Sequence, residues 1–171
     1  MVYADIAARD GLVKTAEGSM IEAQTVCPGK YIAIITGDLS AVKAAVDNAR
    51  ELHGFHLIDS FVLGNPHESI FPAIYGAAKI EDVSALGIFE TYDASSIIVA
   101  ADEDAKTACV DLIELWIARC MCGESYMLLT GEFDAVEAAI ERAKEAVKDR
   151  GMFLDSSVIA HPDAQIRDAI L

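Results

Sequence analysis

The chain repeats itself, and this repeat constrains its fold more than any other feature of the sequence. Three pairs of segments match in the same order: "DGLVKTA" with "DEDAKTA" (10–16 and 102–108), "LSAVKAAVDNA" with "FDAVEAAIERA" (39–49 and 133–143), and "IDSFVLGNPHESI" with "LDSSVIAHPDAQI" (58–70 and 154–166). The offset grows from 92 to 94 to 96 positions, so only small insertions separate the matches. Self-similarity of this kind indicates that the 171 residues contain two copies of one structural unit.

Each copy reads as a helix, a strand, a glycine-flanked loop, a strand, a helix and a last strand. The residues that break these elements around the loops are Pro28, Gly37, Gly123 and Gly131. Strands that alternate with helices at this length predict the α/β class, as an α+β, ferredoxin-like sandwich with helices on one face of a mainly antiparallel sheet. We place the first domain at residues 1–80 and the second at residues 81–171.

The two copies differ at their beginnings. The second copy opens with an apolar strand, "SALGIFET" at 84–91, and its counterpart in the first copy would fall before Met1. The first domain is therefore predicted to lack its opening strand, so that either the natural start lies upstream or another segment fills the gap. An unfilled gap would expose unpaired strand edges and favour aggregation.

Composition excludes several classes of partner. The chain carries 28 acidic against 13 basic residues, a formal charge of -15, which repels nucleic acid and anionic lipid. No apolar run approaches the roughly 18 residues of a membrane span, and no secretory signal opens the chain. We therefore expect a cytoplasmic protein that binds neither nucleic acid nor membrane, and whose four cysteines stay reduced.

With these segments in view, the sequence resembles bacterial microcompartment shell domains. The resemblance is carried by "ALGIFET", "AADEDAKTA", "SYMLLTGEFDAVEAAIERA" and "LDSSVIAHP", and the doubled form with "TVCPGKY" resembles the tandem shell proteins of propanediol-utilisation compartments. It implies a structural, non-enzymatic protein that forms a homotrimer, a pseudo-hexamer of six domains around a central pore. It also implies other microcompartment shell proteins as partners, and lumenal redox enzymes as candidate partners.

In the family that the chain resembles, the loop before the middle strand lines the pore. The matching positions here are Cys27, Pro28, Gly29 and Lys30 in the first domain, and Arg119, Cys120, Met121, Cys122 and Gly123 in the second. In the resembled tandem proteins the cysteine of the CPG motif binds a [4Fe-4S] cluster, so the resemblance implies that three Cys27 thiolates share one cluster on the trimer axis and pass electrons across the shell. Taken alone, Cys27 also fits a small, partly buried residue in a bend.

The chemistry around Cys27 is consistent with that role. Pro28 stiffens the loop, and Gly29 lets backbone amides approach sulfur. Lys30 adds positive charge that favours thiolate.

The second loop, "RCMCG", departs from the family, whose loop is glycine-rich at this point. In an extended stretch alternate residues face the same side, which would turn Cys120 and Cys122 together toward the axis as candidate additional ligands. The alternative is that both thiols are packed beneath the loop. We expect Cys109 to lie in a helix, as part of the core.

Lys14 and Lys106 occupy matching "KTA" positions, where shell domains of this family place a lysine at the tile edge. Such a lysine donates to carbonyls of the neighbouring tile while its alkyl stem packs. His161 and Pro162 resemble the family's terminal Arg-Pro-His edge motif, but the arginine is absent, as it is at Asn65, Pro66 and His67.

Two other readings stay open. A metal-free tile would keep its pore as a passage for metabolites, with Lys30 and Arg119 attracting anions. A thiol enzyme or a zinc site built on "CMC" would need a base nearby, and neither loop contains a histidine.

Overall fold

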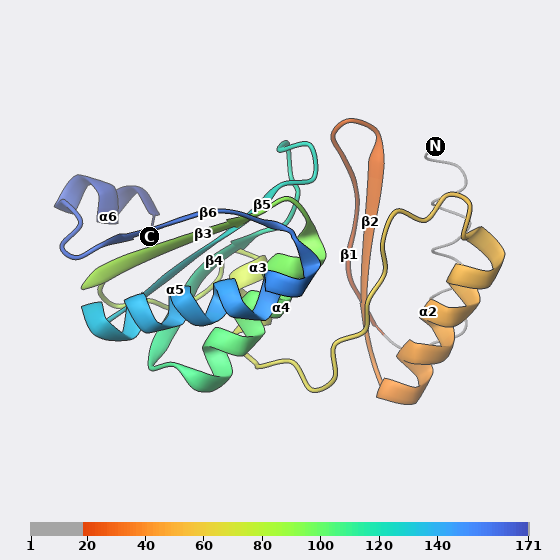
Figure 1. Cartoon of the computed structure of the whole chain (residues 1–171), viewed down its shortest axis with the longest axis horizontal. Helices are drawn as coiled ribbons and strands as arrows, with labels where there is room; N and C mark the ends of the chain where they lie inside the picture. The colour runs from red at the N-terminus through yellow and green to blue at the C-terminus, as the bar shows by residue number, and fades with distance from the viewer. Residues whose placement is uncertain (1–18, 171) are drawn as a thin grey trace. The chain divides into compact units, whose positions relative to one another are not determined.

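The computed structural model describes residues 19–170. The chain divides into two compact units, Met1–Gly64 and Asn65–Leu171, and each is described by itself (Figure 1). The helix predicted at the beginning of the first unit lies outside the described residues. The first unit ends at Gly64, sixteen residues before residue 80, where the first domain is predicted to end. The predicted boundary between the two sequence repeats stays a prediction.

The described part of the first unit begins with a hairpin followed by a helix. Strand β1 (Ser19–Val26) pairs antiparallel with β2 (Lys30–Thr36), and a register shift falls between Met20 and Glu22. Helix α2 (Leu39–His53) follows, and its Ala45 is buried. These elements are the ones that the repeat predicts for positions 19–53.

The last strand predicted for the first unit does not form. Residues 57–63 match β6 (Phe153–Ile159) of the second unit, yet they are irregular, and Arg50 of α2 holds them through hydrogen bonds to Ser60 Oγ (2.6 Å) and to the Ser60 carbonyl oxygen (2.8 Å). The physical reason lies in the pairing of β6, which bonds to β3 (Ala85–Thr91) alone. No counterpart of β3 exists among the described residues of the first unit, so this segment has no strand with which to pair.

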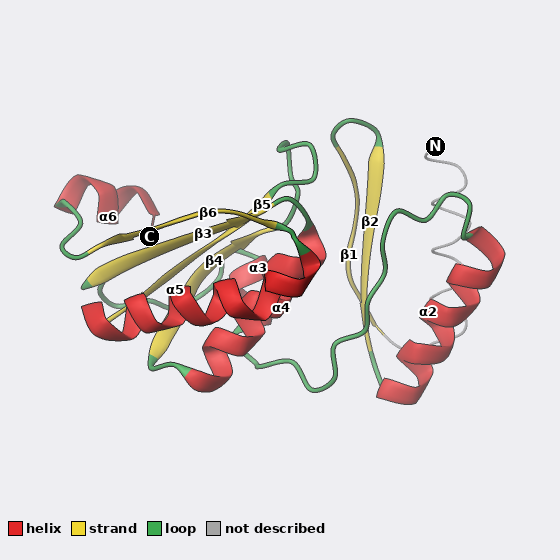
Figure 2. Ribbon diagram, in the orientation of Figure 1, coloured by secondary structure: helices red, strands yellow, loops and turns green. Residues whose placement is uncertain are grey.

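The second unit has the predicted sandwich. Its four strands are antiparallel in the order β4-β5-β3-β6, with β4 at Val110–Trp116 and β5 at Ser125–Gly131. Helices α4 (Ala94–Thr107) and α5 (Phe133–Val147) pack against each other and on the sheet (Figure 2).

Gly87 shows how closely α5 approaches the sheet. A Cβ atom at this position would lie 2.7 Å from Leu129 Cδ1 and 2.9 Å from Val136 Cγ1. The absence of a side chain at Gly87 in β3 therefore permits the close packing of helix on strand.

Three short helices complete the second unit. They are α3 (Ile70–Ile74), the 3-10 helix η1 (Lys148–Arg150) and α6 (Ala164–Ile170). Although α3 belongs by sequence to the first repeat, it packs on β4 and α4 of the second unit.

One buried carboxyl in α4 has no hydrogen-bond partner within the described residues. Asp104 is 0% exposed, and neither of its oxygens accepts a hydrogen bond there. Burial raises the pKa of Asp104 from 3.8 to about 8, although the charge of Arg142 lowers it, and Glu103 adds to the rise. The matching position in the first repeat is Leu12, an apolar residue that needs no partner.

Replacing Asp104 is predicted to change how stability depends on pH. The folded chain keeps a proton on Asp104 that the unfolded chain releases, so stability falls as pH rises from about 4 to about 8. Asp104→Asn removes this fall and raises the free energy of unfolding at pH 8 by up to about 5 kcal/mol. Urea unfolding at pH 5 and pH 8 measures it, and Glu137→Gln, an exposed change of the same charge on α5, is the control. Equal pH slopes for wild type and Asp104→Asn would contradict the prediction.

Candidate pore loops and tile edge

The first candidate pore loop is the tip of the β1–β2 hairpin. Val26 pairs with Lys30, and the loop between them is closed by a hydrogen bond of 3.0 Å from the Gly29 amide to the Val26 carbonyl oxygen. Gly29 has a φ of 101°, which a residue with a side chain rarely adopts. The Cys27–Pro28 peptide bond is cis, and Cys27 is exposed. The hairpin therefore presents the Cys27 thiol to solvent. The Gly29 amide, expected to approach sulfur, donates instead to the Val26 carbonyl oxygen within the turn.

The second candidate loop is a series of turns between β4 and β5. Positive φ values occur at Ala118 (53°), Cys120 (58°), Cys122 (57°) and Gly123 (110°). Each non-glycine residue in this conformation costs roughly 1–2 kcal/mol. The prediction of an extended stretch is therefore wrong, because a left-handed backbone at alternate residues turns the chain instead of extending it.

Local hydrogen bonds hold this second loop in place. The Glu124 amide donates to the Met121 carbonyl oxygen (2.9 Å), and the Ala118 amide donates to Ser125 Oγ (3.0 Å). Cys120 and Cys122 are exposed, so the thiols are not packed beneath the loop as the alternative reading expected.

Two aromatic side chains support the base of the second loop, and sequence reasoning missed them. Trp116 and Tyr126 face each other across the β4–β5 pair and stack at 6.0 Å between ring centroids. Trp116 Nε1 donates to the Arg119 carbonyl oxygen at 2.7 Å, and the Arg119 guanidinium lies 5.4 Å from the centroid of the Trp116 ring. Pairing the two predicted strands across the loop would have found this contact.

The contacts of Arg119 and Tyr126 continue away from the loop. Arg119 Nη2 donates to the Ile74 carbonyl oxygen at 3.5 Å, so this side chain anchors the loop base. Tyr126 donates to Glu114 at 3.0 Å, and burial together with this hydrogen bond raises the pKa of Tyr126 to about 12.

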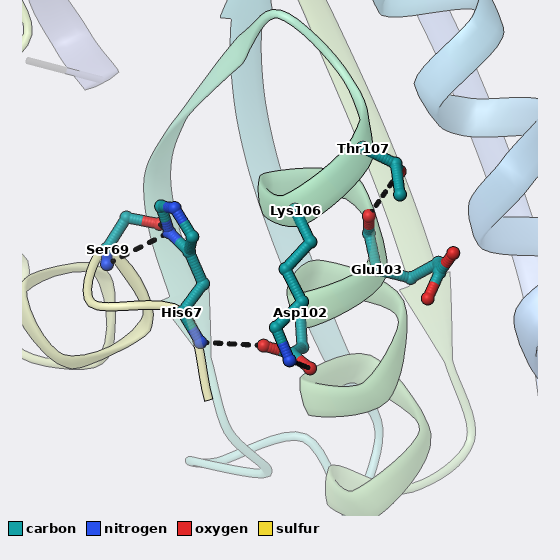
Figure 3. Close-up of polar contacts among 6 residues, drawn as sticks. All are labelled: His67, Ser69, Asp102, Glu103, Lys106 and Thr107. Carbon is teal, nitrogen blue, oxygen red and sulfur yellow. Dashed lines mark hydrogen bonds and ion pairs between the residues drawn. The ribbon is translucent and has the colours of Figure 1, made fainter. Parts of the chain in front are cut away.

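At the candidate tile edge, one carboxylate joins the two repeats. Asp102, whose side chain is 8% exposed, accepts from Lys106 Nζ at 2.7 Å and from the backbone amide of His67 at 2.7 Å (Figure 3). His67 Nδ1 lies 2.8 Å from Ser69 Oγ. Sequence reasoning missed Asp102, although the spacing Asp-x-x-x-Lys recurs at Asp10 and Lys14.

Three further residues of the candidate tile edge are Lys14, His161 and Pro162. Lys14 lies outside the described residues. His161 is exposed and Pro162 is buried.

The prediction for Cys109 is wrong. Helix α4 ends at Thr107, whose hydroxyl donates to the Glu103 carbonyl oxygen, and β4 begins at Val110, so Cys109 lies in the bend between them and is exposed. Its carbonyl oxygen would lie 2.9 Å from a Cβ atom at Gly131. The backbone of Cys109, not its side chain, therefore faces the neighbouring strand.

Within residues 19–170, no group of three or more His, Cys, Asp or Glu side chains is arranged to hold a metal ion. Each chain brings one thiol to the tip of the first loop. Three thiolates of this kind at one metal site would therefore come from three chains. No helix in this range is long and apolar enough to cross a membrane.

Comparison with known families identifies one domain in both halves of the chain. The family model described as the BMC domain matches residues 2–66 and 85–162. The bacterial microcompartment shell protein PduT of Citrobacter freundii is 35% identical over 155 residues, which cover 91% of this chain and 84% of the relative. The carboxysome shell protein CcmK2 of Thermosynechococcus vestitus is 28% identical over 69 residues, covering 38% of this chain and 68% of the relative.

Solved structures agree with these matches. The crystal structure of a microcompartment protein from Desulfitobacterium hafniense DCB superposes with a TM-score of 0.91 at 37% identity, and the match covers 97% of this chain and 92% of that one. The fused permuted hexameric shell protein MSM0275 matches with a TM-score of 0.55 at 22% identity, covering 84% and 75% of the two chains, and shows the fold alone. The resemblance predicted from the repeats is thus confirmed, and the chain belongs to the BMC domain family of bacterial microcompartment shell proteins, with the domain present twice.

Proposed function

We propose that the chain is a non-catalytic tile of a bacterial microcompartment shell in the cytoplasm. Three tandem chains form a pseudo-hexagonal trimer with a central pore, and other shell proteins surround it. The observation that carries this proposal is the BMC domain in both halves of the chain. The relative from Citrobacter freundii, itself a shell protein, matches over 91% of this chain and supports the same role.

The pore of the proposed trimer holds a [4Fe-4S] cluster bound by Cys27 from each chain. The hairpin tip supports this role because the tight turn exposes the thiol and fixes its backbone on both sides. Threefold symmetry supplies three of the four ligands that a cubane cluster needs, and the fourth is a non-protein ligand or a thiol of the second loop.

When bound, the cluster supplies one-electron redox chemistry between the compartment lumen and the cytoplasm. The chain's own residues place the thiol and support the pore walls. Lumenal redox enzymes are the partners that such a path would serve.

Iron binding is predicted to depend on Cys27. Anaerobically reconstituted trimer should contain about four iron and four sulfide per three chains, with the EPR signal of the reduced cluster. Cys27→Ser removes the iron and leaves the trimer intact. Cys109→Ser is the matched control, because Cys109 is exposed but lies outside both loops.

The same iron measurement tests the two cysteines of the second loop. Loss of iron in Cys120→Ser or Cys122→Ser would identify the fourth ligand. A wild-type trimer that binds no iron would contradict the cluster and leave a metal-free pore. In that pore the Arg119 guanidinium is held at the base of the second loop by Trp116 and the Ile74 carbonyl oxygen, and it keeps the positive charge that attracts anions.

Lys106, with Lys14 at the matching position, makes the lateral contacts between tiles. Asp102 is the positioning residue for Lys106, since one of its oxygens holds the ammonium group and the other holds the His67 segment. The Lys106 side chain stays 34% exposed and is therefore available to a neighbouring tile.

Lateral assembly is predicted to depend on this edge. Lys106→Ala should abolish sheets of tiles seen by electron microscopy while the trimer persists in sedimentation, because a donor to the neighbouring tile is lost. Asp102→Asn should weaken sheet formation by a smaller factor, since it removes the charge that orients Lys106. Lys144→Ala is the control, as Lys144 makes an i, i+3 ion pair on α5 with similar exposure. Sheets formed equally by all variants would exclude this edge.

A further inference from the structure

The two repeats end in helices with the same apolar pattern. Continuing the 96-position offset beyond Ile70 and Ile166 pairs α3 with the end of α6. The three positions at i, i+3 and i+4 then hold the same residues in both helices: Ile70, Ala73 and Ile74 in α3, and Ile166, Ala169 and Ile170 in α6. An identical apolar stripe on two equivalent helices indicates an equivalent binding surface.

In α3 this apolar stripe is fully buried. Ile70, Ala73 and Ile74 are 2%, 0% and 3% exposed, and the helix packs on β4 and α4. The Ile74 carbonyl oxygen also accepts from Arg119. The tail of the first repeat thus covers β4, the edge strand of the sheet in the second unit (Figure 1).

In α6 the same stripe is largely uncovered within one chain. No residue of α6 is buried, and Ile166 is 47% exposed. Ile170 packs partly against the cluster that contains Leu86 and Leu128, and Arg167 pairs with Asp82 at 3.3 Å between exposed side chains. Such a surface ion pair holds a helix weakly.

The surface equivalent to β4 lies in the first unit. Strand β1 matches β4 in sequence position, and it pairs only with β2 within the described part of its own unit. Leu112 and Ile113 of β4 are buried, whereas Met20 and Ile21, at the matching positions of β1, are only half-buried in a single chain. Met20 and Ile21 therefore leave room for further burial on β1 that their counterparts on β4 do not have.

We propose that α6 docks on the β1 edge of the first unit of a second copy of this chain, as α3 docks on β4 within one chain. This inference deepens the proposed trimer and rests on it. The contact is heterologous, because the tail of one chain meets the head of the next, and in the proposed trimer three such contacts close a ring. Each chain then makes one contact of α3 with its own β4 and one contact of α6 with β1 of the neighbouring chain.

The first test places a charge on the α6 stripe. Ile166→Asp should raise the dissociation constant of the trimer by roughly 10- to 100-fold, the loss expected for one buried apolar side chain. Sedimentation velocity over a dilution series measures the constant, and circular dichroism checks that the folded chain is unchanged. Gln165→Asp introduces the same side chain beside the stripe on an exposed position and should leave the constant unchanged.

The second test locates the partner surface. A photoreactive benzoylphenylalanine at position 166, in a mixture of light and nitrogen-15-labelled chains, should form crosslinks to residues 19–26 of a different copy. A trimer that is unaffected by Ile166→Asp, with crosslinks to other segments, would overturn the docking of α6 and leave the tile proposal standing. A wild-type chain that stays monomeric across the dilution series would overturn both.

Discussion

The central position of β3 is the constraint on which the rest of the structure depends. This strand bonds to β5 on one side and to β6 on the other, and its Gly87 lets α5 approach the sheet. Residues 57–63 match β6 in the repeat and share its Asp, Ser and Val, yet they form no strand, because the described part of the first unit has no strand in the place of β3. Strand formation here therefore depends on a pairing partner more than on local propensity.

Features that repeat along the chain were predictable from the sequence, and those that depend on contacts across strands were not. The helical spacing at 133–143 and the glycine breakers predicted α5 and the β4–β5 hairpin. The left-handed residues at Cys120 and Cys122 carry no sequence signal comparable to glycine, so the sequence alone predicts an extended loop. The role of Asp102 was also hidden, since its partner His67 lies 35 positions away.

The two repeats match in sequence but differ at single positions and in what surrounds them. Leu12 in the first repeat corresponds to Asp104 in the second, where burial raises the pKa to about 8. The stripe of α3 is buried and that of α6 is not. The duplicated sequence thus keeps the apolar stripe in both copies, while the surroundings of the stripe within one chain differ.

Divergence between the two candidate pore loops has a consequence for the proposed metal site. If both repeats carried the Cys-Pro-Gly hairpin, a trimer would bring six such thiols to its axis, more than the four iron sites of one cubane cluster accept. Because the first hairpin alone has this motif, the number falls to three. The turns of the second loop are built differently, on the Trp116–Arg119 contacts at its base. The reduction from sixfold to threefold symmetry thus leaves three equivalent Cys27 hairpins for the proposed cluster, and the thiols of Cys120 and Cys122 lie on a differently turned loop and are not equivalent to them.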